Sequence, residues 1–295
     1  MGPKWKWLAK IFAFFGIGVG LLGIGTFTQV NGISSAVNNF FDSNNAWTVS
    51  LFGRTYSWTV VISCLILTFC VALVLIGGIQ RISKVAQVIV PFMAATYFLA
   101  GILIILFNIT DVPAAILTIV QSAFGLKAAA GGALGAMVVA MQKGIARGIF
   151  SNEAGLGSAP IAAAAARTNE PVRQGLVSMT ATFIDTIIIC SITGIAIVLT
   201  GAYDMGLEGV AVTTKAFQLG LPFPDGVASF ILMLCLVFFA FTTILGWDYY
   251  SERCLEYLTN GKKKCIKAYR WIYILCVFIG PYMTCLLYTS PSPRD

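Results

Sequence analysis

The stretch GIFSNEAGLGSAP, at residues 148–160, interrupts an apolar segment that runs from residue 131 to residue 166. Its small and polar residues include Ser151, Asn152, Glu153, Gly155 and Gly157. Glycine costs about 1 kcal/mol at a helical position, and Ser and Asn compete for backbone hydrogen bonds. At membrane depth, non-helical backbone is tolerated only inside protein or beside a water-filled cavity. We therefore expect a broken helix that forms a binding site, with a loop at the membrane surface as the alternative.

The composition is that of a polytopic, all-α membrane protein. Of the 295 residues, 58% are hydrophobic and 11% are charged, whereas soluble domains carry about 25% charged residues. The positive-inside rule explains the formal charge of +7 better than nucleic acid does, and we expect no nucleic-acid partner. The chain has no histidine, and its eight cysteines form no C-x-x-C pair. We therefore expect no cofactor, no metal other than sodium and no disulfide framework.

Seven hydrophobic segments are long enough to cross a bilayer, which needs about 20 largely apolar residues. They are Leu8–Val30, Trp58–Gly77, Val85–Phe107, Gly131–Ala166 with its break, Gly175–Leu199, Val227–Trp247 and Ala268–Leu287. If the N-terminus is cytoplasmic, most Lys and Arg residues fall in cytoplasmic connections, which supports seven crossings. Residues 288–295, YTSPSPRD, are expected to be a polar tail foreign to the natural protein, with a disordered native tail as the alternative.

Two acidic residues, Glu153 and Asp185, fall inside these segments. An intramembrane carboxylate costs about 2.5–3.5 kcal/mol on insertion scales and usually faces the bundle interior. We expect Glu153 to pair with Arg147 or Lys143, either as a structural ion pair that holds the break open or beside a bound ligand. For Asp185 we favour a structural role, with bonds to neighbouring backbone or to the same basic groups.

The two ends of the break carry opposite partial charges. The half-helix that begins near Ser158 would present free N–H groups, which attract a carboxylate. The carbonyl end of the preceding half-helix, near Phe150, would attract a cation or an ammonium group. Such a pair of ends suits a zwitterion, or a cation together with an anion.

Polar residues of two other segments could complete the site. Gln29 closes the first segment and could face the cavity or bond one helix to another. Thr243 and Trp247 are four residues apart and share a helical face. With Thr242 they could offer hydroxyl oxygens to sodium, while the indole covers a small apolar side chain. The alternative is an interfacial Trp with threonines bonded to their own helix.

Three stretches resemble the bacterial alanine or glycine:cation symporter family: KGIARGIFSNEAGLGSAPIAAAAA at 143–166, GIGTFTQVN at 23–31 and FTTILGW at 241–247. The resemblance covers roughly residues 8–287 and implies a LeuT-type fold of two inverted five-helix repeats. It also implies sodium-coupled uptake of a small neutral amino acid, alanine or glycine, through the inner membrane. On that fold the seven spans correspond to helices three to nine. The chain then resembles an internal fragment, with one transporter domain at residues 1–287 that lacks the first two and the last helices and is inactive alone.

The resemblance also implies which residues form the site. Substrate contacts fall to Gln29, Phe150, Asn152, the backbone around Ser151 and Gly155, and to Thr243 and Trp247, while Thr242 and Thr243 bind sodium. Ala163 and Glu170 stand where the family pattern leads us to expect histidine, away from the site. The resulting expectation is a secondary transporter in the lipid bilayer that works by alternating access and makes or breaks no bond. The alternatives are a proton-coupled permease, a channel, or a membrane enzyme, for which the sequence offers no nucleophile–base pair.

Overall fold

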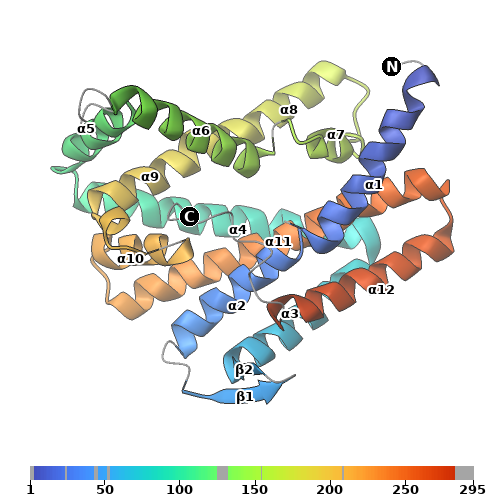
Figure 1. Cartoon of the computed structure of the whole chain (residues 1–295), viewed down its shortest axis with the longest axis horizontal. Helices are drawn as coiled ribbons and strands as arrows, with labels where there is room; N and C mark the ends of the chain where they lie inside the picture. The colour runs from blue at the N-terminus through green and yellow to red at the C-terminus, as the bar shows by residue number, and fades with distance from the viewer. Residues whose placement is uncertain are drawn as a thin grey trace. The chain divides into compact units, whose positions relative to one another are not determined.

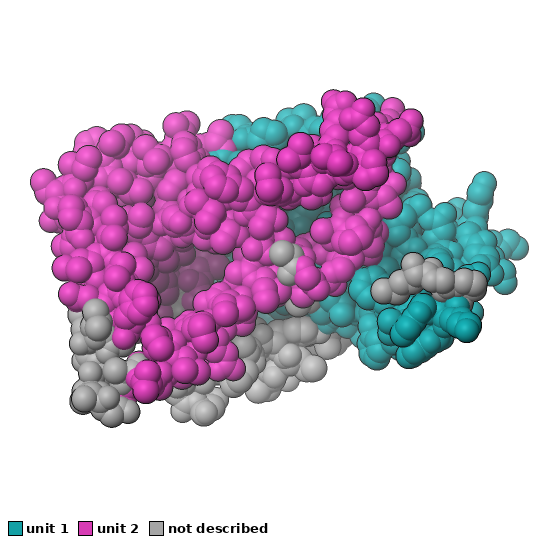
Figure 2. Space-filling model, turned by 90° about the horizontal axis from the view of Figure 1, so that it is seen from above, with its two compact units in different colours: residues 1–94, 233–295 teal, residues 95–232 magenta. Residues whose placement is uncertain are grey.

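The structure is a computed structural model that describes residues 3–23, 25–42, 46–51, 54–124, 132–153, 155–207 and 209–282. Nearly all of the described residues are helical, and one short hairpin supplies the strands (Figure 1). The chain divides into two compact units, residues 1–94 with 233–295 and residues 95–232, which Figure 2 shows in different colours. Two long helices, α4 (Gly78–Phe107) and α11 (Asp225–Thr259), contribute residues to both units.

The first unit contains four helices besides its parts of α4 and α11. They are α1 (Lys6–Leu22), α2 (Phe27–Phe41), α3 (Trp58–Ile76) and α12 (Lys263–Ile279), with short 3-10 turns η1 (Pro3–Trp5) and η4 (Gly280–Tyr282). Between α2 and α3 an antiparallel hairpin pairs β1 (Thr48–Leu51) with β2 (Arg54–Ser57), in the register Thr48↔Ser57. The side chain of Ser57 caps α3 by accepting a hydrogen bond from the amide of Thr59, at 3.3 Å.

The core of this unit lies where α2, α3, α11 and α12 meet. Val30, Leu75, Ile244, Tyr273 and Val277 are almost completely buried there. Tyr273 is accommodated because its hydroxyl donates a hydrogen bond to the carbonyl of Ile244, 2.8 Å away. A buried phenol without such a partner would cost about 1–3 kcal/mol.

Helix α1 approaches α11 closely through its glycines. A β-carbon at Gly20 would lie 1.7 Å from the hydroxyl oxygen of Ser251, and one at Gly16 would lie 2.8 Å from the sulfur of Cys254. Small residues of this kind let the backbones of two membrane helices come together.

The second unit contains the elements between α4 and α11. They are α5 (Val112–Ala123), α6 (Ala133–Asn152), α7 (Ser158–Ala163), α8 (Pro171–Phe183), the π-helical turn η2 (Ile184–Ile189), α9 (Cys190–Leu199), η3 (Ala202–Asp204) and α10 (Val210–Gly220). Helix α9 packs against α5 and α10. The hydroxyls of Tyr97 and Thr193 lie 2.6 Å apart, and the amide nitrogen of Asn108 donates to the carbonyl of Gly220 at 3.1 Å. These bonds join α4, and the residue that follows it, to α9 and α10.

Five stretches of the described residues are long and apolar enough to cross a membrane: Lys6–Phe41, Trp58–Ile76, Gly78–Phe107, Pro171–Leu199 and Asp225–Thr259. They match five of the seven predicted spans and confirm a multi-pass, helical membrane protein. The remaining two predicted spans correspond to α6 with α7 and to α12, which has 17 residues. The total of seven crossings, the LeuT-type arrangement and the single domain over residues 1–287 stay predictions.

Several boundaries differ from the sequence prediction. The first span is not the continuous segment Leu8–Val30, because α1 ends at Leu22 and α2 begins at Phe27. The hairpin and helices α5 and α10 were not predicted, since each is too short to produce a spanning signal. The predicted tail at residues 288–295 and the end of the last segment, at 283–287, lie outside the described residues.

Candidate functional site

The predicted break in the fourth segment is confirmed. Helix α6 stops at Asn152 and helix α7 starts at Ser158. Glu153 has a left-handed backbone conformation with φ 55°, and Gly157 has φ 85° directly before α7. Only glycine adopts such angles without a Cβ penalty, so Gly157 fits the reversal of the chain. However, α7 ends at Ala163 instead of continuing through the alanine run, and a helix of six residues offers a smaller dipole than we expected.

Glu153 is bonded to the side chain of the first residue of α7. The hydroxyl of Ser158 donates a hydrogen bond to the carboxylate of Glu153, with an O–O distance of 2.6 Å. The ion pair that we expected between Glu153 and Arg147 or Lys143 stays a prediction. Glu153 lies past the end of α6 in a left-handed conformation, and its side chain reaches forward to α7.

The end of α6 is bonded to the π-helical turn η2. The hydroxyl of Ser151 donates to the carboxylate of Asp185 at 2.7 Å, and the amide nitrogen of Asn152 donates to the hydroxyl of Thr186 at 2.9 Å. Asp185 therefore has a hydroxyl partner, and the backbone or basic partner that we expected stays a prediction. A π-helical turn is rare and frequently marks a functional site. The two bonds fix the polar end of α6. Phe150 is the last aromatic residue of this helix and is 40% exposed.

The predicted cation ligands Thr242 and Thr243 are bonded to their own helix. Thr242 donates to the carbonyls of Phe238 and Phe239, at 3.0 and 2.9 Å, and Thr243 donates to the carbonyl of Phe239 at 2.8 Å. This is the back-bonded geometry that the sequence left open as an alternative. It uses the hydroxyl hydrogens and leaves oxygen lone pairs, so it remains compatible with a cation ligand.

Trp247 packs against a second interruption, between α1 and α2. A β-carbon at Gly25 would lie 2.4 Å from the β-carbon of Trp247, and the indole is 9% exposed. Thr26 is completely buried, and its hydroxyl donates to the carbonyl of Gly20 at 2.5 Å. Gln29 follows in the first turns of α2 and is half-buried. Sequence reasoning missed this interruption, although the two glycines before Thr26 are a signal that could have revealed it.

The predicted substrate site is divided between the two units. Phe150, Ser151, Asn152 and Gly155 belong to the second unit, and Gln29, Thr242, Thr243 and Trp247 belong to the first. That the two groups meet around one substrate stays a prediction.

The first unit also contains a cavity of about 910 Å³ between α2, α3 and α11. Its lining is mainly apolar, with Ile33, Ile62, Leu67 and Phe241 among its members, and it contains none of the predicted site residues. Asp42 lies at its edge. The hydrogen bond from Ser57, followed by that from the amide of Ala46, holds the pKa of the Asp42 carboxyl below its ordinary value. The lining suits hydrocarbon better than the charged groups of an amino acid.

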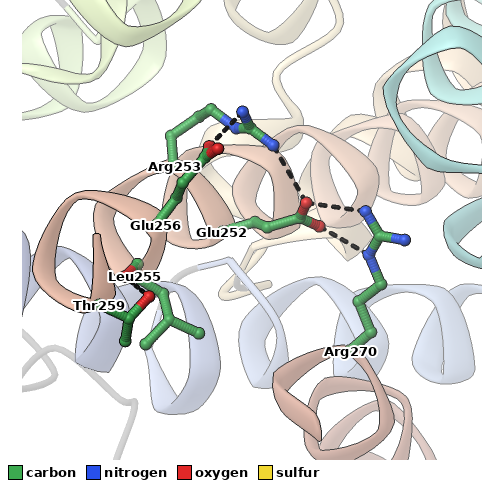
Figure 3. A network of polar contacts seen from close by, with 6 residues as sticks. All are labelled: Glu252, Arg253, Leu255, Glu256, Thr259 and Arg270. Carbon is green, nitrogen blue, oxygen red and sulfur yellow. Dashed lines mark hydrogen bonds and ion pairs between the residues drawn. The ribbon is translucent and has the colours of Figure 1, made fainter. Parts of the chain in front are cut away.

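A charged cluster at the end of α11 was also missed (Figure 3). Glu252 is almost buried and accepts two hydrogen bonds from Arg270 of α12, Nε–Oε2 at 2.8 Å and Nη2–Oε1 at 2.7 Å. Arg253 lies on the other side of the same carboxylate, 3.1 Å away, and also pairs with Glu256. In the sequence analysis these basic residues counted only toward the membrane topology. Their pairing could not be predicted because Glu252 and Arg270 lie on different helices.

Comparison with known proteins gives a consistent result. The model of the sodium:alanine symporter family matches residues 1–288. An uncharacterized transporter of Haemophilus influenzae is 50% identical over 280 residues, which cover 94% of this chain and 57% of the relative. A sodium/alanine symporter of Methanococcus maripaludis is 41% identical over 93% of this chain and 56% of its own length. A "Probable sodium/glutamine symporter" of Bacillus subtilis is 40% identical over 81% and 49%. The chain thus spans about half the length of the curated relatives it matches.

Proposed function

The chain belongs to the sodium:alanine symporter family, and from that membership we propose that it is part of a secondary transporter that couples sodium entry to uptake of alanine or glycine. The family and the relatives named above are transporters and not enzymes. The proposed setting is the inner membrane, with the N-terminus of this chain in the cytoplasm and a LeuT-type arrangement of helices. Transport proceeds by alternating access, in which the site opens to one side of the membrane at a time.

The observation that supports the proposal most directly is the interruption between α6 and α7, at residues 153–157. Helix α6 ends there in exposed polar groups whose positions are fixed by Asp185 and Thr186. Interrupted helices of this kind hold substrate and coupling ion in transporters because their backbone ends are free to bind. In the proposed site Phe150, Asn152 and the backbone at Gly155 contact the amino acid.

The residues of the first unit complete the proposed site. The back-bonded hydroxyls of Thr242 and Thr243 contribute oxygen ligands for sodium. Trp247 covers the small side chain of the substrate, and Gln29 lies beside it. A small covered pocket would explain a preference for alanine or glycine, and a larger pocket would admit glutamine, which the printed name of one relative mentions.

The experiment is uptake of labelled amino acids into proteoliposomes, with the protein at the full length that its gene encodes. Alanine, glycine, serine and glutamine are compared with and without an inward sodium gradient. We expect sodium-dependent uptake of alanine or glycine. Uptake driven by a proton gradient without sodium would favour the proton-coupled alternative, and flux without a gradient requirement would favour a channel.

Thr243→Val tests the sodium ligand. Removal of one oxygen ligand is expected to raise the sodium concentration for half-maximal uptake by about tenfold, equivalent to roughly 1.4 kcal/mol. Thr259→Val is the matched control, because Thr259 makes the same bond to the carbonyl four residues earlier, also at 2.8 Å, near the end of the same helix. Equal effects of the two substitutions would contradict a sodium-binding role for Thr243.

A further inference from the structure

Asp248 is a buried acid that the proposed transport site does not use. Its side chain is completely buried, and neither carboxylate oxygen has a hydrogen-bond partner among the described residues. An isolated ionised carboxylate is far more costly to bury than a neutral group, and buried acids without a counter-ion usually become neutral instead. The buried carboxyl of Asp248 therefore needs either a nearby positive charge or a bound proton.

The groups that face Asp248 come from two helices. On its own helix, Glu252 lies one turn further along α11 and interacts with it electrostatically, as does Arg270 of α12. Two phenols of α12, those of Tyr269 and Tyr273, also lie within electrostatic range. Tyr273 donates to a backbone carbonyl, and the buried hydroxyl of Tyr269 interacts with the side chain of Ser251 without a well-formed hydrogen bond.

The positive charge nearest to Asp248 in this cluster, that of Arg270, is already paired with Glu252. The guanidinium of Arg270 makes two hydrogen bonds to Glu252, at 2.8 and 2.7 Å, and these neutralise that carboxylate (Figure 3). Arg253 lies between Glu252 and Glu256 and balances the latter. An ionised Asp248 would thus leave one uncompensated negative charge in the interior of the unit.

We propose that Asp248 is a proton-binding site that is neutral in the described packing of α11 against α12 and the α1–α2 interruption. A proton fits better than a sodium ion, because sodium requires several oxygen ligands and the surrounding carboxylate oxygens of Glu252 are bonded to arginine. The proposal does not depend on which amino acid is transported.

The spacing of the acids on α11 gives the proton a route to water. Asp248, Glu252 and Glu256 recur every four residues and therefore share one face of the helix. Their exposure rises along this face, since Asp248 is 0% exposed, the Glu252 side chain 6% and the Glu256 side chain 38%. Loss of the proton through this row would place a bare charge beside the α1–α2 interruption and favour conformations that admit water there.

The test is infrared difference spectroscopy on the purified protein in lipid. We expect the carbonyl stretch of a protonated carboxylic acid at neutral pH, shifted by carbon-13 labelling of aspartate and lost in Asp248→Asn. Asp225→Asn is the matched control, because Asp225 is exposed at the other end of the same helix. The band should persist in that variant and should not respond to sodium.

The pH dependence of folding stability supplies a second measurement. A carboxyl that holds a proton only when folded makes the folded state bind more protons than the unfolded state, so stability falls as pH rises. The folded-to-unfolded ratio should fall by up to about tenfold per pH unit above roughly pH 5 in the wild type, and less steeply in Asp248→Asn.

Three outcomes would overturn the proposal. In the first, the wild type shows no aspartate-labelled acid band, a result that does not require any variant to fold. In the second, Asp248→Asn keeps the band or the full pH dependence of the wild type. In the third, sodium at neutral pH abolishes the band, which would identify a sodium site instead.

Discussion

Substitution of Arg270 by methionine should be among the most destabilising changes at the surface of the first unit. Arg270 supplies two of the three charged hydrogen bonds to Glu252, a carboxylate whose side chain is only 6% exposed. Hydrogen bonds to charged groups contribute about 1.5–3 kcal/mol each. Removal of one partner of a buried pair costs about 3–5 kcal/mol, because the remaining charge is left without compensation. We therefore expect Arg270→Met to lower the free energy of unfolding by about 3–5 kcal/mol.

The assay is equilibrium unfolding in mixed micelles, followed by tryptophan fluorescence. Glu256→Gln is the control, because it removes an ion pair of the same helix whose side chains are 35% and 38% exposed. Such exposed pairs contribute about 0–1 kcal/mol. The double variant Glu252→Gln with Arg270→Met should recover much of the lost stability, since both charges are then absent.

Two results would refute this reasoning. Equal costs for Arg270→Met and Glu256→Gln would mean that burial does not strengthen the Glu252 pair. A double variant as unstable as the sum of its single variants would mean that the two residues do not interact. The same measurements also test the charge of Asp248. If Asp248 is neutral, the effects of Asp248→Asn and Arg270→Met on the free energy of unfolding should be nearly additive. If it is ionised, the two effects should be strongly coupled.

Two further predictions concern α1 and the hairpin. Gly20→Ala should destabilise the protein by about 1–3 kcal/mol in thermal unfolding, because its new methyl group would meet Ser251, whereas Gly18→Ala, with nothing within 4 Å, should be neutral or stabilising. The pKa of Asp42 is lowered in the folded state, chiefly by Ser57, so its contribution to stability is present above the ordinary aspartate pKa and is lost as pH falls through the lowered value. The protection of the hairpin amides, which is their exchange rate relative to that of free peptide amides at the same pH, should therefore fall in acid, and Asp42→Asn should lower this protection and remove its dependence on pH in this range.

The two interruptions show why one was predicted and the other was missed. At residues 153–157 the sequence itself departs from helix, with Gly155 and Gly157 in left-handed conformations that match their presence there. Between α1 and α2 the surrounding sequence is apolar enough that a hydropathy window passes over the interruption. One local and one tertiary contact mark the end of the helix there, since Thr26 bonds back to Gly20 and Trp247 occupies the space beside Gly25.

Side-chain partners were harder to predict than helix positions. For Glu153 the sequence offered cations upstream, but the backbone turn directs the carboxylate to Ser158. For Asp185 the partner is Ser151, which is 34 residues away and meets it only through the packing of α6 on η2. Spacing along one helix cannot reveal such contacts, because it depends on neither the conformation at a break nor the pairing of helices.

The same limitation concealed the role of the basic residues near the end of α11. Counted for topology, Arg253 and Arg270 are two positive charges among many on one side of the membrane. In the folded unit both arginines form ion pairs with Glu252. The positive charge of Arg270, which could otherwise compensate an ionised Asp248, is therefore already paired. The chain thus keeps one acid without a cation in a region that is short of positive charge only after folding. A residue selected purely for packing could have been asparagine, whose neutral amide has nearly the same shape. A proton that can be released explains an acid at this position, because the amide of asparagine has no such proton to release.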